Sequence, residues 1–188
     1  GRVGNGWGRE SSRSVGYGVS WTPLLDSRGN GPQTWGDRAV MVISPDGQDV
    51  YVGFNRGNSF VVSSHDGGAN FNTAVQTSDD TRSWFHSAGA VAPNGDVYVA
   101  WVRWNPYSSG PIDIEVVRSV DGGASFNFVT EPMTGEVNPM DPLASSFCGR
   151  PALNANFPSA PDGIRYLPSP QLEVGPDGCL HVVYSYDP

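Results

Sequence analysis

Short runs of alternating apolar and polar residues, separated by tight turns, dominate the chain. Three pairs of such runs flank an Asp-Gly or Asn-Gly turn, at Asp46-Gly47, Asn94-Gly95 and Asp177-Gly178. This dipeptide between alternating apolar runs is the strongest short-range signal of a β-hairpin. The pattern therefore predicts hairpins over residues 39–54, 88–102 and 171–184, and further strands over residues 59–63, 71–75, 112–118 and 126–130.

An eight-residue motif, S-x-D-G-G-A-x-F, follows each of the first two hairpins. We term residues 64–71 the first box and residues 119–126 the second box, and an eroded copy over residues 14–21 has Gly16 in place of the aspartate. The copies begin 50 and 55 residues apart. Each complete box lies between two predicted strands, so the unit is four short strands in about 50 residues, a period typical of a β-propeller blade. The defining residues are Ser64, Asp66, Gly68 and Phe71 in the first box, and Ser119, Asp121, Gly123 and Phe126 in the second.

The residue types in the box favour a structural role. Glycines allow a positive φ in a tight turn. The carboxylates of Asp66 and Asp121 can accept hydrogen bonds from amides of their own turns. The closing residues Phe71 and Phe126 are predicted to pack beneath the blade. We therefore expect the two aspartates to hold the turns rather than to perform catalysis.

The boxes resemble the Asp-box repeats of sialidases, sortilin-type receptors, xyloglucan-active glycosidases and photosystem assembly propellers. The resemblance spans residues 14–184 and implies an all-β fold, a segment of about three four-stranded antiparallel blades from a propeller of six or more. We expect further blades or another chain to complete it. The expected divisions are a partial blade over 1–30, blades over 31–78 and 79–131, a long loop over 131–168, and a partial blade over 169–188.

Composition and charge narrow the class of fold and the classes of partner. With Gly 24, Pro 16, 11% aromatic and 16% charged residues, the chain is turn-rich and suited to burying a core, unlike a helix bundle or a disordered chain. The net charge is −8, and all eleven basic residues are Arg without a basic cluster, which argues against nucleic acid and anionic membranes. No apolar run approaches the roughly 20 residues of a transmembrane helix. Cys148 and Cys179 either form a disulfide or remain thiols.

In the related propellers the functional site lies at the rim opposite the boxes. The resemblance therefore implies a set of ligand-binding candidates on the loops and strand ends that reach this rim. Arg side chains pair with carboxylates in bidentate fashion, and Trp faces stack on sugar rings. The alternative is that these are ordinary loop arginines and aromatic residues at blade junctions. The candidates are Asp37, Arg38, Arg56, Trp84, His86, Arg103, Trp104, Tyr107 and Arg150.

Two hypotheses of function follow. In the first, a secreted or cell-envelope-exposed propeller binds a glycan or a protein, or serves as a structural module. In the second, the chain is part of a sialidase-like exo-glycoside hydrolase. That family uses three arginines, an Asp acid/base and a Tyr nucleophile helped by a Glu. Its Arg-Ile-Pro motif is absent here, Arg38 stands at the equivalent strand start, and Glu115 lies inside a predicted strand. The three histidines have no metal-ligand spacing, and we expect no metal and no cofactor.

Overall fold

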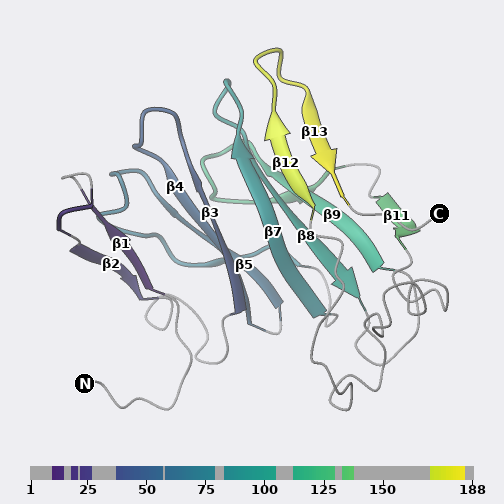
Figure 1. The fold of residues 1–188 in the computed structure, drawn as a ribbon, viewed down its shortest axis with the longest axis horizontal. Coiled ribbons are helices and arrows are strands. Elements are labelled where there is room, and N and C mark those ends of the chain that lie inside the picture. Colours follow the sequence, from purple (N-terminus) through teal and green to yellow (C-terminus); the bar gives the residue numbers. More distant parts are fainter. Residues whose placement is uncertain are drawn as a thin grey trace.

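The computed structural model describes residues 10–14, 18–20, 22–26, 37–56, 58–78, 83–104, 112–129, 133–137 and 170–184. Within these ranges every regular element is a β-strand, and every strand pair is antiparallel (Figure 1). The predicted all-β fold of antiparallel four-stranded sheets is confirmed. The same ranges hold no helix long and apolar enough to cross a membrane.

The first blade is a four-stranded sheet in sequential order. The hairpin predicted around Asp46-Gly47 forms its first two strands, and the first box connects its third strand to its fourth. The predicted run over residues 71–75 is wrong for its first four residues, because the fourth strand starts only at Val75. The strands are β3 (Asp37–Ile43), β4 (Val50–Arg56), β5 (Asn58–Ser64) and β6 (Val75–Gln76).

The second blade repeats this order, with the second box between its third and fourth strands. Its strands are β7 (Ser83–Val91), β8 (Val97–Trp104), β9 (Ile112–Ser119) and β10 (Asn127–Phe128). A further strand, β11 (Met133–Val137), pairs with the other end of β9, where Met133 lies opposite Ile114. Residues 133–137 had been predicted to belong to a long loop. They form a strand because β10 leaves this part of the edge of β9 open.

Two separate hairpins flank the two blades (Figure 1). The strands β1 (Glu10–Arg13) and β2 (Thr22–Asp26) enclose the eroded box. The strands β12 (Gln171–Val174) and β13 (Leu180–Val183) enclose the Asp177-Gly178 turn. By comparison with the complete blades, β1 and β2 occupy the third and fourth positions of a blade, whereas β12 and β13 occupy the first and second.

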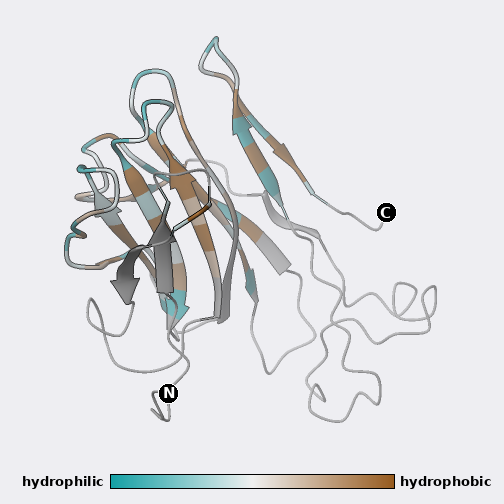
Figure 2. Cartoon of the chain, turned by 60° about the vertical axis from the view of Figure 1, so that its left-hand side comes forward, coloured by the Kyte–Doolittle hydropathy of each residue, from teal (hydrophilic) through white to brown (hydrophobic). Residues whose placement is uncertain are grey.

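The core consists of side chains packed between successive sheets. One layer joins the two blades, and Gly89 lets their innermost strands approach, because a Cβ there would lie 2.3 Å from Cγ2 of Val42. A second layer packs β7, β8 and β9 of the second blade against the β12–β13 hairpin. Figure 2 shows hydrophobic stretches along the strands, interrupted by hydrophilic residues. The buried residues between the blades are Val42, Tyr51, Val61, Val97, Val99, Trp101 and Val117.

The three turns that connect the first strand of a blade to its second share one geometry. This shared geometry explains why the same dipeptide pattern predicted all three turns. The amide of each turn glycine donates to the carbonyl three residues earlier, at 2.8 Å for Gly47 and 2.9 Å for Gly95 and Gly178. Their φ angles are +74°, +89° and +81°, a region that favours glycine.

Candidate functional site

The first box is a turn closed by its own serine and aspartate. Ser64 Oγ donates to Asp66 Oδ1 at 2.8 Å and accepts from the Gly68 amide at 2.9 Å. Asp66 Oδ1 also accepts from the Asn70 amide at 2.9 Å, and Asp66 Oδ2 accepts from Asn70 Nδ2 at 2.7 Å. Both carboxylate oxygens are therefore engaged within the turn.

The second box repeats these bonds at equivalent positions. Ser119 Oγ donates to Asp121 Oδ1 and accepts from the Gly123 amide, both at 2.8 Å. The Ser125 amide and hydroxyl donate to the two oxygens of Asp121 at 2.9 and 2.6 Å. In the eroded box the Gly18 amide donates to Ser14 Oγ at 2.9 Å, so the serine-to-glycine bond is kept there.

These hydrogen bonds lower the pKa of the two aspartate carboxyl groups in the boxes. The pKa of Asp66 falls to about 2, chiefly through the hydrogen bond from the Asn70 side chain. The pKa of Asp121 falls to about 2, chiefly through the hydrogen bond from the Ser125 side chain. A general acid or base works best with a pKa near the operating pH. Both carboxylates are thus poorly suited to proton transfer at neutral pH and are committed to holding their turns.

The second box also sits tightly against the first blade. A Cβ at Gly123 would lie 3.0 Å from both Cε1 of Tyr51 and Cβ of Ser63, and a Cβ at Gly122 would lie 3.1 Å from Cε1 of His65. The His65 ring is held by Asp49, with 2.7 Å between Nδ1 and Oδ1. The box glycines therefore serve close packing between blades as well as the turn itself.

The closing phenylalanines are less deeply placed than predicted. Phe71 packs against the cluster of Val50, Val52, Phe54, Phe60 and Val62 on one face of the first blade, and Phe126 packs against the layer between the blades. Both are half-buried rather than buried. They lie at the ends of the sheets, where solvent reaches part of each ring.

Strand register places most of the ligand-binding candidates at the rim opposite the boxes. Asp37 lies opposite Asn55, Arg56 opposite Asn58, and Trp84 opposite Arg103. Arg38 and Trp104 are the chain neighbours of Asp37 and Arg103, whereas His86, opposite Trp101, lies further along β7 toward the boxes. Tyr107 and Arg150 lie outside the described residues. The backbone thus gathers Arg38, Arg56 and Arg103 at one rim from two adjacent blades.

A buried ion pair marks this end of the second blade. Arg103 and Glu115 are 8% and 2% exposed, and Arg103 Nη1 lies 2.5 Å from Glu115 Oε1. Because side chains alternate across a strand, both share the face of Trp101, which packs toward the first blade. Sequence reasoning noted Glu115 only as a strand residue. In the sequence, Glu115 alternates in phase with Asp113 against Ile112, Ile114 and Val116, which is typical of a solvent-facing position, so the pattern gave no signal of a buried pair.

Hydroxyl groups line the corresponding end of the first blade. Ser59 Oγ and Thr77 Oγ1 are 2.7 Å apart, and the Ser59 amide donates to Ser78 Oγ at 3.0 Å. Ser59 lies opposite Asn55, and alternation places both on the face that meets the second blade. The end of the inter-blade layer away from the boxes is therefore polar, with Asn55 and Ser59 on one side and Arg103 and Glu115 on the other.

Thirteen solved chains are structurally similar to this one. Among them, "Hadza microbial sialidase Hz136" matches with a TM-score of 0.59 and 12% sequence identity, over 94% of this chain and 35% of the sialidase chain. The chain is a segment of a β-propeller with a sialidase-like fold. It spans about a third of the length of that sialidase. No family model and no curated protein matches the sequence.

The potential metal ligands and the thiol of the described residues were compared for an assembled centre. The described residues hold no group of three or more His, Cys, Asp or Glu placed to bind a metal ion. Cys179 is an exposed free thiol, and its hydrogen bond with Asp177 raises its pKa. Cys148 lies outside the described residues.

Proposed function

We propose that this Asp-box propeller is a recognition module that binds a carboxylated glycan at the rim opposite the boxes. The observation that carries the proposal is the strand register, which brings Arg38 and Arg56 to one rim together with Trp84 and Trp104, beside the buried pair of Arg103 and Glu115. Guanidinium groups bind carboxylates through paired hydrogen bonds, and indole faces suit sugar rings. A secreted or envelope-exposed location is part of this proposal.

The charges of the box rim support the same choice of face. The Asp66 and Asp121 carboxylates are engaged within their own turns, and Arg118 donates through Nε to Asp96 Oδ2 at 2.9 Å. These charged side chains near the boxes therefore already have intramolecular partners. Recognition of an anionic ligand is better served by the other rim.

The test is calorimetric titration of the intact protein with sialyllactose and with lactose. We expect sialyllactose to bind at least tenfold more tightly, and Arg38→Ala or Arg56→Ala to remove most of this preference. A charge-assisted hydrogen bond contributes about 1.5–3 kcal/mol, roughly 10- to 150-fold in affinity. Arg118→Ala, on the box side, is the matched control and should bind normally. Equal binding of the two sugars would contradict the proposal.

A second candidate function is hydrolysis of a sialoside, favoured by the structural likeness to a protein named as a sialidase. Release of a fluorogenic aglycone from an α-sialoside by the intact protein would show it. Glu115→Gln then separates the roles of this carboxylate. If Glu115 only holds Arg103 in place, the variant changes the free energy of unfolding, while the rate of turnover per folded molecule stays the same.

A further inference from the structure

The turn of the second blade carries an asparagine where the equivalent turns of the other two hairpins carry an aspartate. Asp46 and Asp177 precede the turn glycine in those hairpins, and Asn94 precedes Gly95 in the second blade. Through Oδ1, each of these side chains accepts a hydrogen bond from the backbone amide two residues later, at 3.0 Å in the first and third turns and 3.2 Å in the second. The turn geometry therefore suits either residue type, and the amide of Asn94 needs a separate reason.

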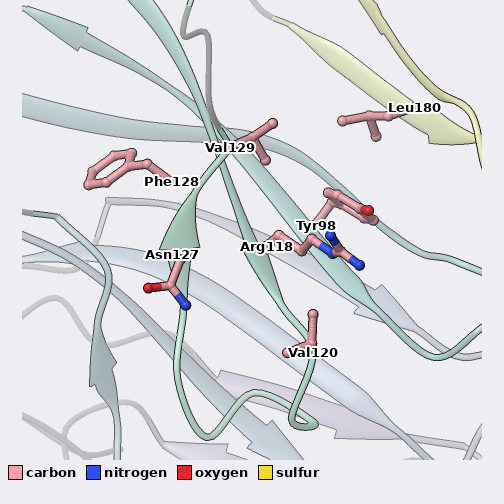
Figure 3. A pocket seen from close by; sticks show the side chains of 7 residues that line it. All are labelled: Tyr98, Arg118, Val120, Asn127, Phe128, Val129 and Leu180. Atoms are coloured by element: carbon pink, nitrogen blue, oxygen red, sulfur yellow. The ribbon is translucent and has the colours of Figure 1, made fainter.

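The separate reason is the neighbouring carboxylate of Asp96. Asn94 Nδ2 donates to Asp96 Oδ2 at 2.9 Å, and Asp96 is only 7% exposed. Arg118 Nε donates to the same oxygen at 2.9 Å, and its guanidinium lies over the Tyr98 ring, 5.9 Å from the ring centroid. Figure 3 shows Arg118 and Tyr98 side by side in the lining of an open pocket of about 360 Å³. A second carboxylate at residue 94 would lie within hydrogen-bond distance of Asp96, and two carboxylates so close together disfavour each other's ionisation.

The dipeptide Asn94-Gly95 is chemically able to lose this amide. A glycine has no side chain to hinder its backbone nitrogen from attacking the side-chain carbonyl of the preceding residue. The Gly95 nitrogen gives its proton to hydroxide and bonds to Cγ of Asn94, the bond from Cγ to Nδ2 breaks, and ammonia leaves. Water then opens the cyclic imide to aspartate or isoaspartate. Both residues are exposed, so water and hydroxide reach them.

The folded hairpin opposes this reaction at both reacting groups. The Gly95 amide, which must lose its proton, donates to the Ala92 carbonyl at 2.9 Å. The Asn94 side chain, whose Cγ must approach the Gly95 nitrogen, is held by Asp96 through both Nδ2 and Oδ1. The negative charge of Asp96 also disfavours the anion that forms on the attacking nitrogen. Reaction therefore requires these hydrogen bonds to open first.

We propose that Asn94 is a deamidation site, that Asp96 protects it in the folded chain, and that its conversion to aspartate destabilises the second blade. The product can accept the hydrogen bond from the Asp96 amide, as Asp46 and Asp177 accept the equivalent bonds, but it no longer donates to Asp96 Oδ2 and repels it. Val97 lies opposite Ser119, so the site is at the rim that carries the boxes. It is independent of the glycan-binding proposal, which concerns the other rim.

The first test follows deamidation of the intact protein by peptide mapping with mass spectrometry, at mildly alkaline pH, with and without urea. Two other Asn-Gly pairs of the chain, Asn5-Gly6 and Asn30-Gly31, give the rate of the same dipeptide in urea. We expect Asn94 to convert in urea as fast as these two. In native buffer it should convert at least about tenfold more slowly than in urea, since the hairpin must open first. Equal rates at Asn94 in the two conditions overturn the proposal.

The second test separates protection by Asp96 from general stability. Asp96→Ala and Arg118→Ala both break the ion pair between these residues, but only Asp96→Ala removes the carboxylate that holds Asn94. We expect Asp96→Ala to accelerate conversion of Asn94 in native buffer by about tenfold, the equivalent of one charge-assisted hydrogen bond. Arg118→Ala should convert at the wild-type rate. Equal acceleration in both variants, or none in Asp96→Ala, overturns the protective role.

If Asp96→Ala does not fold, Asp46→Asn provides the comparison within one molecule. It places the same dipeptide in the first turn, where the side chain is held through Oδ1 by the Ser44 hydroxyl and the Gln48 amide. The introduced asparagine should convert faster than Asn94 in native buffer, and equal or slower conversion contradicts the proposal.

The third test concerns the consequence of the modification. Asn94→Asp reproduces the aspartate product, and we expect it to lower the urea midpoint of unfolding while sialyllactose titration stays unchanged. An unchanged midpoint overturns the proposed destabilisation.

Discussion

Among the differences between the two complete blades, one concerns a pair of facing buried side chains at equivalent positions. In the first blade Phe54 lies opposite Phe60, and their rings stack with centroids 5.9 Å apart. In the second blade Trp101 lies opposite Glu115, and the glutamate is paired with Arg103. The strand order and the box are the same in both. The blade backbone thus tolerates either an aromatic stack or a buried ion pair, because turns and boxes define it locally.

The largest expected difference is between two single variants that place leucine at equivalent positions, Glu115→Leu in the second blade and Phe60→Leu in the first. Glu115→Leu leaves the Arg103 guanidinium buried without its carboxylate, and loss of one partner of a buried pair costs about 3–5 kcal/mol. Phe60→Leu exchanges one apolar side chain for another and should cost less than about 1.5 kcal/mol. Urea unfolding of the intact protein measures both. Equal losses of unfolding free energy in the two variants would mean that breaking the ion pair costs no more than an apolar substitution.

The next effect concerns the contact between the blades. Gly123→Ala forces a Cβ to within 3.0 Å of Tyr51 and Ser63 at a φ of +85°, whereas Gly47, at +74°, has open space around it. Gly47→Ala should lose only the roughly 1–2 kcal/mol of a left-handed conformation. Gly123→Ala should lose more by about 1 kcal/mol or above, as overpacking adds to the strain. Identical unfolding midpoints for the two variants would contradict the close packing.

A smaller effect is expected when both charges are removed together. The double variant Arg103→Met with Glu115→Leu converts the second blade to the apolar type of the first. Well-packed apolar replacements of buried ion pairs are often neutral or stabilising. We expect the free energy of unfolding to return to within about 1.5 kcal/mol of the wild type. A double variant as unstable as Glu115→Leu alone would show that shape, rather than charge, decides this site.

The smallest effect concerns the boxes, where the two blades should behave alike. A pKa of about 2 in the folded state, below the ordinary 3.8, means that the fold favours the ionised carboxylates of Asp66 and Asp121. Their contribution to stability is present above about pH 4 and is lost as the pH falls through 2. Carboxyl titration by NMR should give midpoints near 2 for both. Asp66→Asn should flatten the pH dependence of unfolding in this range.

Much of the fold could be read from the sequence because its signals are local. The Asp-Gly and Asn-Gly turns and the S-x-D-G-G-A-x-F boxes each act over a few residues, through positive φ and short-range hydrogen bonds. These motifs correctly placed the three hairpins. The position of the arginine-bearing rim followed from the same order of strands. Its role in binding stays a prediction.

Other features were decided by tertiary structure. β11 forms because part of the edge of β9 is open, a circumstance that residues 133–137 do not record. The pairing of Arg103 with Glu115 requires the register of β8 with β9 and the face that each side chain takes. The conformation of each turn depends on residues a few positions apart, so the sequence by itself determined the repeat and its strands. Contacts between residues distant in the chain depend on how sheets stack, and only the three-dimensional structure decided them.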